Sequence, residues 1–469
     1  MSSSQAVWTA LGAIAVLLLI IALWTLRRAR TVEEFHLAGR KLGVIRGGLS
    51  AVASAYSFWV MVGVTGAAFT FGWSAVWLAI GIVLGAAFTW FFVVPAVRRA
   101  ATARAAETAL ELVGGAGESS AAAIISVTSI AAVAALFGIV AQLGFAGTAV
   151  AREIGMHPAV GVALVGALAL LGAVLGGLRA TASAGFLCAL LVIPVAVFLP
   201  LFGLVFIGPL NQLPTALATT GEGATALFGL RSGLDTAVLL LAALGLGAGI
   251  CGQPQVLEHF LAARSDRAVR WSGVPAIAWL LIVLAMALVL GWVARVDYAS
   301  IANPDEVMFE VPRRVMPPSF IALPIIAVLA LVVCSVGNQL VVTCYGLLAV
   351  ARNRAAPAVG LGRLRIVILL AGIAAAGIAA VSGVGSSRGF LLAWLAVSAT
   401  VGPLVLLTCA GVQIRQGWVA AAARVAIALT LVLFLLRRER LVEIAMFLPF
   451  YAALLVALLG RKREVLGPR

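Results

Sequence analysis

The sequence predicts an all-α protein that crosses a membrane many times. Of its 469 residues, 63% are hydrophobic and 10% are charged, and the mean hydropathy is +1.16. So few polar side chains cannot cover the surface of a soluble globular protein. About thirteen apolar segments are each long enough to cross a bilayer. They cover residues 7–26, 46–66, 74–94, 121–150, 158–175, 181–206, 234–251, 271–293, 319–350, 366–381, 390–409, 419–436 and 444–459.

The first apolar segment predicts the orientation of the chain. Arg27, Arg28 and Arg30 follow it, whereas a signal peptide carries its positive charges first. We therefore expect a retained helix with its N-terminus outside. Alternating the spans from there places most basic residues, and the C-terminus, on the cytoplasmic side.

The net charge of +15 is spread over short segments between apolar runs. This pattern is typical of membrane topology signals and argues against a nucleic-acid surface. The five cysteines lie inside apolar runs without CxxC spacing, so we expect neither disulfides nor a metal site. The abundance of arginine, alanine and glycine is typical of a GC-rich bacterial genome, which suggests a bacterial inner membrane.

The second apolar segment, RGGLSAVASAYSFWVMVGVTG at 46–66, is rich in small and hydroxyl residues. It predicts a broken membrane helix, because unwound backbone is tolerated at membrane depth only where it faces protein or a water-filled cavity. Tight packing of an intact helix through small residues is the alternative. A second interrupted segment, LGLGAGICGQP at 244–254, has four glycines before a proline.

The spacing of these two broken helices predicts an internal repeat. Five spans separate their starts, which is the distance expected for two inverted five-helix halves. We place the first half at residues 43–206 and the second at 229–409. One extra helix at 1–30 and two at 410–469 complete a single transporter domain that covers 1–469.

No acidic residue lies deep inside a predicted span, so a buried carboxylate relay for protons is not expected. Hydroxyls, amides and backbone carbonyls remain, and such oxygens suit a hard cation such as sodium. An isolated Ser or Thr more commonly bonds to the carbonyl one turn back. The adjacent amides of Asn338 and Gln339 carry more weight, since both need partners across the bundle.

Four motifs in order resemble the sodium:solute symporter family, and most closely its sodium/proline branch. EEFHLAGRKLG with LSAVASAYSFWVMVGVTGAAF resembles the cytoplasmic loop and first core helix of that family. LGLGAGICGQPQVLEHFLAARS is similar to its glycine-rich broken helix and the loop after it. VVCSVGNQLVVTCYG and AWLAVSATVGPLVLL are similar to the helix that closes the ion site and to a late Gly-Pro helix.

The resemblance implies ten core helices in two inverted halves and transport driven by sodium, with no enzymatic activity and no cofactor. Ser57 would line the solute site, and Arg40 would lie on the cytoplasmic route to the ion. The sodium site would use the backbone carbonyls of Ala53, Tyr56 and Leu331 and the hydroxyl of Ser335. Its fifth position is held here by the thiol of Cys334.

Several positions depart from that branch. Ala55 and Gly185 stand where it has acidic residues, and the Cys334 thiol is a poor ligand for a hard ion. Aromatic residues expected around the solute are replaced by Gly138, Leu246 and Ile250, while Phe58 stands in place of a glycine. These changes predict that the solute is not proline bound as in that branch, but a small aliphatic amino acid or short carboxylate.

We therefore expect a sodium-coupled symporter that imports a small organic solute. Its partners would be membrane lipid, sodium and the solute, without an obligate protein partner. The alternative is a transporter-like receptor, or a transport-inactive relative, that works with a separate signalling protein. Uptake of the solute, as opposed to binding without uptake, separates the two.

Overall fold

The computed structural model describes residues 2–104, 106–113, 121–208, 210–298, 300–351, 359–383, 385–436 and 439–462. Within these ranges the protein is helical, and strand-like pairing is limited to two isolated bridges. The longer helices are α1 (Ser3–Leu26), α3 (Val44–Tyr56), α4 (Trp59–Phe71), α5 (Val76–Phe88), α6 (Val94–Arg104), α8 (Ala121–Ile154), α9 (Pro158–Ile207), α11 (Leu234–Ala248), α13 (Asp266–Asp297), α15 (Ala322–Ala351), α16 (Leu361–Ser382), α17 (Ser387–Cys409), α18 (Gln416–Leu435) and α20 (Leu448–Leu459).

Shorter helices and turns connect them. They are α2 (Val32–His36), η1 (Ala38–Arg40), η2 (Gly72–Ala75), η3 (Thr89–Val93), α7 (Ala109–Val113), η4 (Leu210–Gln212), α10 (Leu213–Ala218), η5 (Gly249–Gly252), α12 (Pro254–Leu261), η6 (Pro304–Glu306), α14 (Val307–Val315), η7 (Pro318–Ile321) and α19 (Glu439–Ala445).

Among the described residues, 11 helices are long and apolar enough to cross a membrane. This number does not confirm the expected thirteen spans. Two of the 11 are unusually long, Trp59–Arg104 with 46 residues and Pro158–Val205 with 48 residues. Each contains parts of two of the expected spans, so the whole difference of two arises at these two places.

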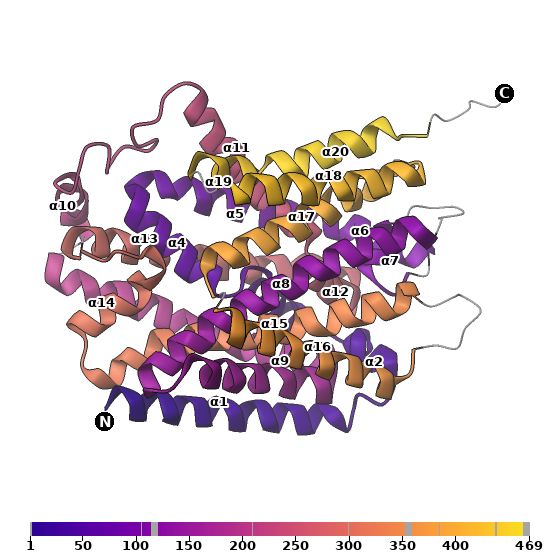
Figure 1. The fold of residues 1–469 in the computed structure, drawn as a ribbon, viewed down its shortest axis with the longest axis horizontal. Coiled ribbons are helices and arrows are strands. Elements are labelled where there is room, and N and C mark those ends of the chain that lie inside the picture. Colours follow the sequence, from indigo (N-terminus) through magenta and orange to yellow (C-terminus); the bar gives the residue numbers. More distant parts are fainter. Residues whose placement is uncertain are drawn as a thin grey trace.

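The chain turns back inside both long stretches, at glycines with left-handed backbone. Gly177 has φ 57° and ψ −147°. In a continuous helix, Gly172 and Thr181 would be separated by about 13.5 Å along the axis. A β-carbon built on Gly172 would instead lie 3.8 Å from the Thr181 side chain, so the chain reverses between them. Gly72, with φ 60°, ends α4, and α4 and α6 lie toward opposite ends of the molecule (Figure 1).

The first broken helix consists of α3 and α4, which are separated at Ser57 and Phe58. Ser57 has φ 49° and ψ −144°, a conformation that a residue with a side chain rarely adopts. The second broken helix consists of α11, η5 and α12. Its break falls at Gln253, with φ −89° and ψ 107°, because a residue before proline avoids the helical region and Pro254 starts α12. Both interruptions agree with the sequence prediction.

The two broken helices begin the two halves that the sequence predicts, which correspond to α3–α9 and α11–α17. A parallel backbone bridge between Leu42 and Ala263 ties the chain just before α3 to the chain just after α12. Helices α15 and α17 are the most enclosed of the long helices. By contrast α1, α16 and α20 lie at the periphery, where their exposed apolar side chains suit contact with lipid (Figure 1).

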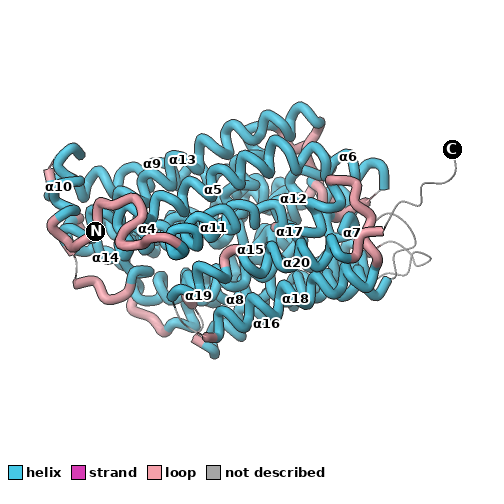
Figure 2. The backbone as a smooth tube through the Cα atoms, turned by 90° about the horizontal axis from the view of Figure 1, so that it is seen from above, coloured by secondary structure: helices cyan, strands magenta, loops and turns pink. Residues whose placement is uncertain are grey.

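The helices run roughly along one axis, so that the molecule has two distinct ends. The N-terminus, α10 and α14 lie at one end, while α6 and α7 lie at the other, as both views show (Figures 1 and 2). The segments that carry α10 and α14 therefore share an end with the N-terminus. That this end faces the exterior remains a prediction.

Candidate functional site

The candidate site starts at the C-terminal end of α3, where the helix breaks. The last four carbonyls of a helix have no partner within it, and in α3 they belong to the residues from Ala53 to Tyr56. The Ser54 carbonyl accepts a hydrogen bond from the Ser335 hydroxyl of α15 at 3.2 Å. The Ala55 carbonyl accepts one from the Trp394 indole of α17 at 2.8 Å. The carbonyls of Ala53 and Tyr56 are the two that the sequence assigns to sodium.

Ser335 therefore lies where the sequence prediction requires it, against the broken end of α3. Its side chain is fully buried, as are those of Ala53 and Leu331. The partial negative charge of a helix C-terminus, added to buried carbonyl and hydroxyl oxygens, favours a cation at this junction. No ion is needed to explain the bond to Ser54, so the sodium ligands stay a prediction.

Cys334 makes a different contact. Its thiol lies 2.9 Å from the thiol of Cys188 in α9, and both cysteines are free. A thiol that donates to another thiol is a weak partner for a hard ion. The neighbouring Asn338 is bonded through its carbonyl oxygen to the Thr181 hydroxyl, while its amide nitrogen has no hydrogen-bond partner.

Amide side chains extend the junction toward α8. The Gln339 amide donates to the Ser335 hydroxyl at 3.1 Å, and the Gln142 amide donates to the Gln339 side-chain oxygen at 3.2 Å. Gln142 also donates to the Gly138 carbonyl at 3.1 Å. Three elements are joined in this way, and the buried side-chain oxygen of Gln142 has no partner. Buried polar groups without partners are rare in folded proteins and mark this region as a candidate binding site.

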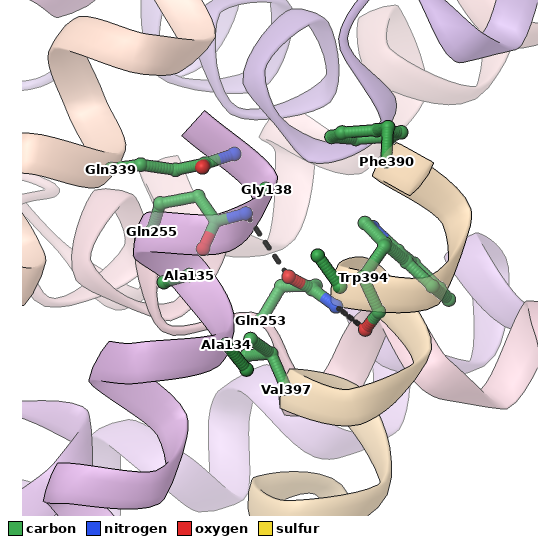
Figure 3. Close-up of a pocket in the computed structure, with 10 residues that line it drawn as sticks. Ala134, Ala135, Gly138, Gln253, Gln255, Gln339, Phe390, Trp394 and Val397 are labelled. Carbon is green, nitrogen blue, oxygen red and sulfur yellow. Dashed lines mark hydrogen bonds between the residues drawn. The ribbon is translucent and has the colours of Figure 1, made fainter. Parts of the chain in front are cut away.

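A narrow cavity of about 10 Å³, room for about one water molecule, adjoins these amides (Figure 3). Gln253, at the break of the second broken helix, donates to the Trp394 carbonyl at 2.9 Å and accepts from the Gln255 amide at 3.1 Å. Amide groups, two aromatic rings and small apolar side chains thus surround one space. The lining residues are Ala134, Ala135, Gly138, Gln253, Gln255, Gln339, Phe390, Ala393, Trp394 and Val397.

Of the five residues that the sequence assigns to the solute, Gly138 lines this cavity. Phe58 lies nearby, since its ring is 5.4 Å from that of Phe390 and stacks on Phe145 at 4.4 Å. Ser57 is buried and its hydroxyl has no hydrogen-bond partner. Leu246 and Ile250 are fully buried and are not part of the lining.

Sequence reasoning missed the aromatic side of the cavity. Phe390 and Trp394 lie one turn apart on α17, and Trp394 also stacks on Tyr56 at 5.5 Å. The motif around Ala393 was recognised, but the large aromatic residues within a helix of small ones were not singled out. Those two rings and Gly138 lie in the same cavity lining.

Arg40 lies at the other end of α3, in a turn with left-handed backbone. Its guanidinium donates to the Glu33 carboxylate at 3.1 Å and to the Leu261 carbonyl at 3.5 Å. It therefore connects the segment before the first broken helix to the end of the second. A role for Arg40 along the route of the ion stays a prediction.

A second buried polar cluster lies where α2, α7, α12 and α15 meet. Sequence analysis treated the residues after Pro254 as a loop, but they form α12, in which all eight residues are buried. The Glu258 carboxylate accepts from the Ala109 backbone amide at 3.0 Å, and its other oxygen lies 3.9 Å from Nε2 of His36. The His36 ring stacks on Tyr345 at 3.7 Å. In the sequence, Glu258 and His259 stand side by side in the mainly apolar segment PQVLEHFL, and this pattern could have indicated a buried polar cluster.

Burial sets the charge of this cluster. Glu258 and His36 lie outside the membrane-spanning helices. Loss of solvation raises the pKa of Glu258 to about 8, although the bond from the Ala109 amide opposes that shift. Loss of solvation also lowers the pKa of His36 to about 4. At neutral pH both groups are thus mostly uncharged, which explains how an acid and a base can be buried together without an ion pair.

Comparison with known proteins connects this geometry to a family. A model of the sodium:solute symporter family matches residues 35–409. The osmoregulated proline transporter OpuE of Bacillus subtilis is 22% identical over 445 residues, which cover 91% of this chain and 88% of OpuE. The sodium/proline symporter of Escherichia coli is 26% identical over 337 residues, which cover 69% of this chain and 66% of that protein.

Solved structures show a similar fold. A Na⁺-coupled sialic acid symporter in a substrate-bound, outward-open state has a TM-score of 0.80 and 16% sequence identity, over 97% of this chain and 99% of that one. Mhp1, a nucleobase-cation-symport-1 family transporter with bromovinylhydantoin bound, has a TM-score of 0.59 and 12% identity, over 91% and 93%. At such identities the likeness establishes the arrangement of the helices.

Proposed function

Because this chain belongs to the sodium:solute symporter family, we propose that it is a bacterial plasma-membrane symporter that uses sodium to import a small amino acid or related solute. Its relatives are transporters and not enzymes. The observation that carries the proposal is the bond from Ser335 to the broken end of α3. Sodium held there would bridge two helices, and would favour whichever state brings them together.

Coupling would follow from that preference. An ion shifts a conformational equilibrium only as far as its affinity differs between the two states. The Ser335 hydroxyl is linked through Gln339 to Gln142, and Gln339 also lines the cavity. By fixing the position of the Ser335 hydroxyl, sodium would therefore also fix the Gln339 side chain, which lines the solute cavity. By linkage, the solute would raise sodium affinity by the same factor.

For the solute, we propose a small amino acid and place proline first among the candidates. The relatives named above are proline transporters, and Phe390 and Trp394 offer the apolar faces that a ring can contact. These two rings support proline in spite of the replacements at Gly138, Leu246 and Ile250. Amide groups of Gln253, Gln255 and Gln339 would bind the polar end of the solute.

A receptor that binds the solute without transporting it is the second candidate. Two positions favour it. Ala55 removes a carboxylate from the ion site of the resembled branch, and the Cys334 thiol bonds to Cys188. With weak sodium binding, the protein could still bind the solute in its cavity, but solute binding would not be coupled to sodium.

Thermal stability of the purified protein tests the binding part of the proposal. Proline, other small amino acids and short carboxylates would be added in sodium chloride and, separately, in potassium chloride at equal ionic strength. At a concentration a hundred times its dissociation constant, a ligand stabilises the folded state by about 2.7 kcal/mol. We expect one solute to stabilise the protein more in sodium than in potassium. Equal stabilisation in both salts would favour the receptor.

A further inference from the structure

A strongly basic cavity lies at the end of α1, remote from the solute cavity. It has a volume of about 520 Å³. Six cationic side chains line it, from Arg27, Arg28, Arg30, Lys41, Arg46 and Arg179, together with the carboxylate of Glu34. Trp24, Ala38 and Leu42 complete the lining. The only carboxylate in this lining, Glu34, already accepts hydrogen bonds from the backbone amides of Arg30 and Thr31, which start α2.

The basic side chains of this cavity outnumber its one carboxylate, Glu34, which interacts electrostatically with Arg179 and Lys41. Within the described part of the chain, none of the six forms an ion pair. Arg46 and Arg179 are part-buried and are bonded to protein oxygens, Arg46 to the Arg179 carbonyl at 3.1 Å and Arg179 to the Ala38 carbonyl at 3.0 Å. The buried Nε of Arg46 has no hydrogen-bond partner. Mutual repulsion among these groups disfavours the empty cavity and favours a bound anion.

Topology signals alone do not account for this arrangement. Basic residues directly after a membrane helix are expected on the cytoplasmic side, and this explains the three arginines that follow α1. It does not explain why Lys41, Arg46 and Arg179, which come from three other segments, face the same space. Convergence of distant basic residues between helices at the cytoplasmic side is typical of sites for acidic lipid headgroups.

The adjoining surface of α1 is suited to acyl chains. Its exposed face is apolar up to the cavity, with Ile20 59%, Leu23 50% and Trp24 45% exposed. The Arg28 guanidinium lies 4.1 Å from the centre of the Trp24 ring. Tryptophan is enriched at the level of lipid headgroups. An exposed apolar strip therefore leads into a basic cavity at that level.

From this combination we propose that the cavity binds the phosphate-bearing headgroup of an anionic phospholipid, whose acyl chains lie along α1. Arginine guanidinium groups match phosphate oxygens in geometry and charge. The lipid would join α1 to η1, α3 and the middle of α9. It would thus tie the peripheral helix to the segment that carries the first broken helix.

Native mass spectrometry and thermal stability in detergent test this proposal without any transport assay. The purified protein would be given phosphatidylglycerol, phosphatidylcholine or inorganic phosphate. The test variant is Arg27→Gln/Arg28→Gln/Lys41→Gln, which spares the three arginines bonded to backbone carbonyls, Arg30, Arg46 and Arg179. The matched control, Arg415→Gln/Arg461→Gln/Lys462→Gln, removes three exposed basic residues elsewhere.

We expect the wild type and the control to retain phosphatidylglycerol and to be stabilised by it. Each basic residue near the headgroup contributes about fivefold to affinity, so the test variant should bind roughly a hundredfold more weakly. Equal lipid retention by the test variant, or equal loss in the control, would contradict the proposal. Stabilisation by inorganic phosphate as large as that by phosphatidylglycerol would also overturn it, because the site would then serve a dissolved anion.

Discussion

At the scale of single residues, the account depends most on Ser335, whose hydroxyl bonds to the Ser54 carbonyl. Ser335→Ala should raise the sodium concentration needed for half-maximal effect about tenfold, because one interaction of hydrogen-bond strength represents about 1.4 kcal/mol. Sodium-dependent stabilisation of the purified protein gives this value. Ser272→Ala is the matched control, since that buried hydroxyl bonds within its own helix at 2.6 Å. An unchanged sodium dependence in Ser335→Ala would exclude Ser335 as a ligand.

Glu258 makes a prediction about pH. Its pKa is about 8 in the folded protein, above the usual 4.5 of a glutamate. The folded state therefore holds the proton more tightly than the unfolded state does, and the stability from this group is lost as pH rises through about 8. Between pH 7 and 9 the loss is roughly 1.4 kcal/mol.

Glu258→Gln should remove this loss, since a glutamine can still accept the bond from the Ala109 amide. Melting temperatures at pH 7 and 9 measure the effect, and this range avoids the titration of His36. Glu222→Gln, at an exposed carboxylate, is the control. A parallel fall of the melting temperature in wild type and Glu258→Gln would show that Glu258 does not carry the pH dependence.

Sequence reasoning reached the backbone part of the site better than the side-chain part. The helix break near Ser57 and the contact of Ser335 with α3 could be predicted because each depends on a short continuous stretch of sequence. The cavity is built by Gly138, Gln255 and Trp394, which come from separate helices. Their proximity depends on helix rotation and packing, which no local pattern encodes. The same reason explains why the burial of Glu258 was missed.

At the scale of helices, the reversal inside α9 depends on Gly177. A β-carbon there would lie 2.3 Å from the Phe35 carbonyl oxygen, and φ is 57°. Gly177→Ala should lower stability by more than the roughly 1–2 kcal/mol of left-handed backbone strain, since the contact adds to it. The yield of monodisperse protein and its melting temperature measure this effect.

Gly377→Ala provides the opposite control. Gly377 lies inside α16, and a β-carbon there would meet nothing within 4 Å. Alanine is favoured over glycine in a helix interior by roughly 0.5–1 kcal/mol. This variant should be as stable as the wild type or slightly more so. If Gly177→Ala melts at the temperature of Gly377→Ala, the chain does not need a glycine at the reversal.

The helical elements were largely predictable because their apolar runs are long. The predicted spans also end and restart around both reversals, at 66 and 74 on either side of Gly72 and at 175 and 181 on either side of Gly177. The short helix α12 was read as a loop because its charged residues are buried by α3, α7 and α15, which lie far away in the sequence.

At the scale of the whole molecule, the N-terminus and the end of α20 lie at opposite ends (Figure 1). Single cysteines introduced at Ser3 and at Lys462 should therefore react from opposite sides of the membrane. We expect Ser3→Cys to be labelled in intact cells by an impermeant maleimide, and Lys462→Cys only after permeabilisation. The unsubstituted protein is the control, because four of its native cysteines are buried and the fifth is partly so. Labelling of both positions from one side would contradict the predicted odd number of crossings.

Uptake by proteoliposomes tests whether the protein couples sodium to solute transport. Purified protein would be reconstituted with an inward sodium gradient, and the accumulation of labelled proline, or of the solute that best stabilises the protein, would be followed over time. We expect accumulation above the external concentration with the sodium gradient, and none with a potassium gradient or without protein. Binding of the solute without accumulation, or equal uptake in sodium and potassium, would contradict a sodium-driven symporter.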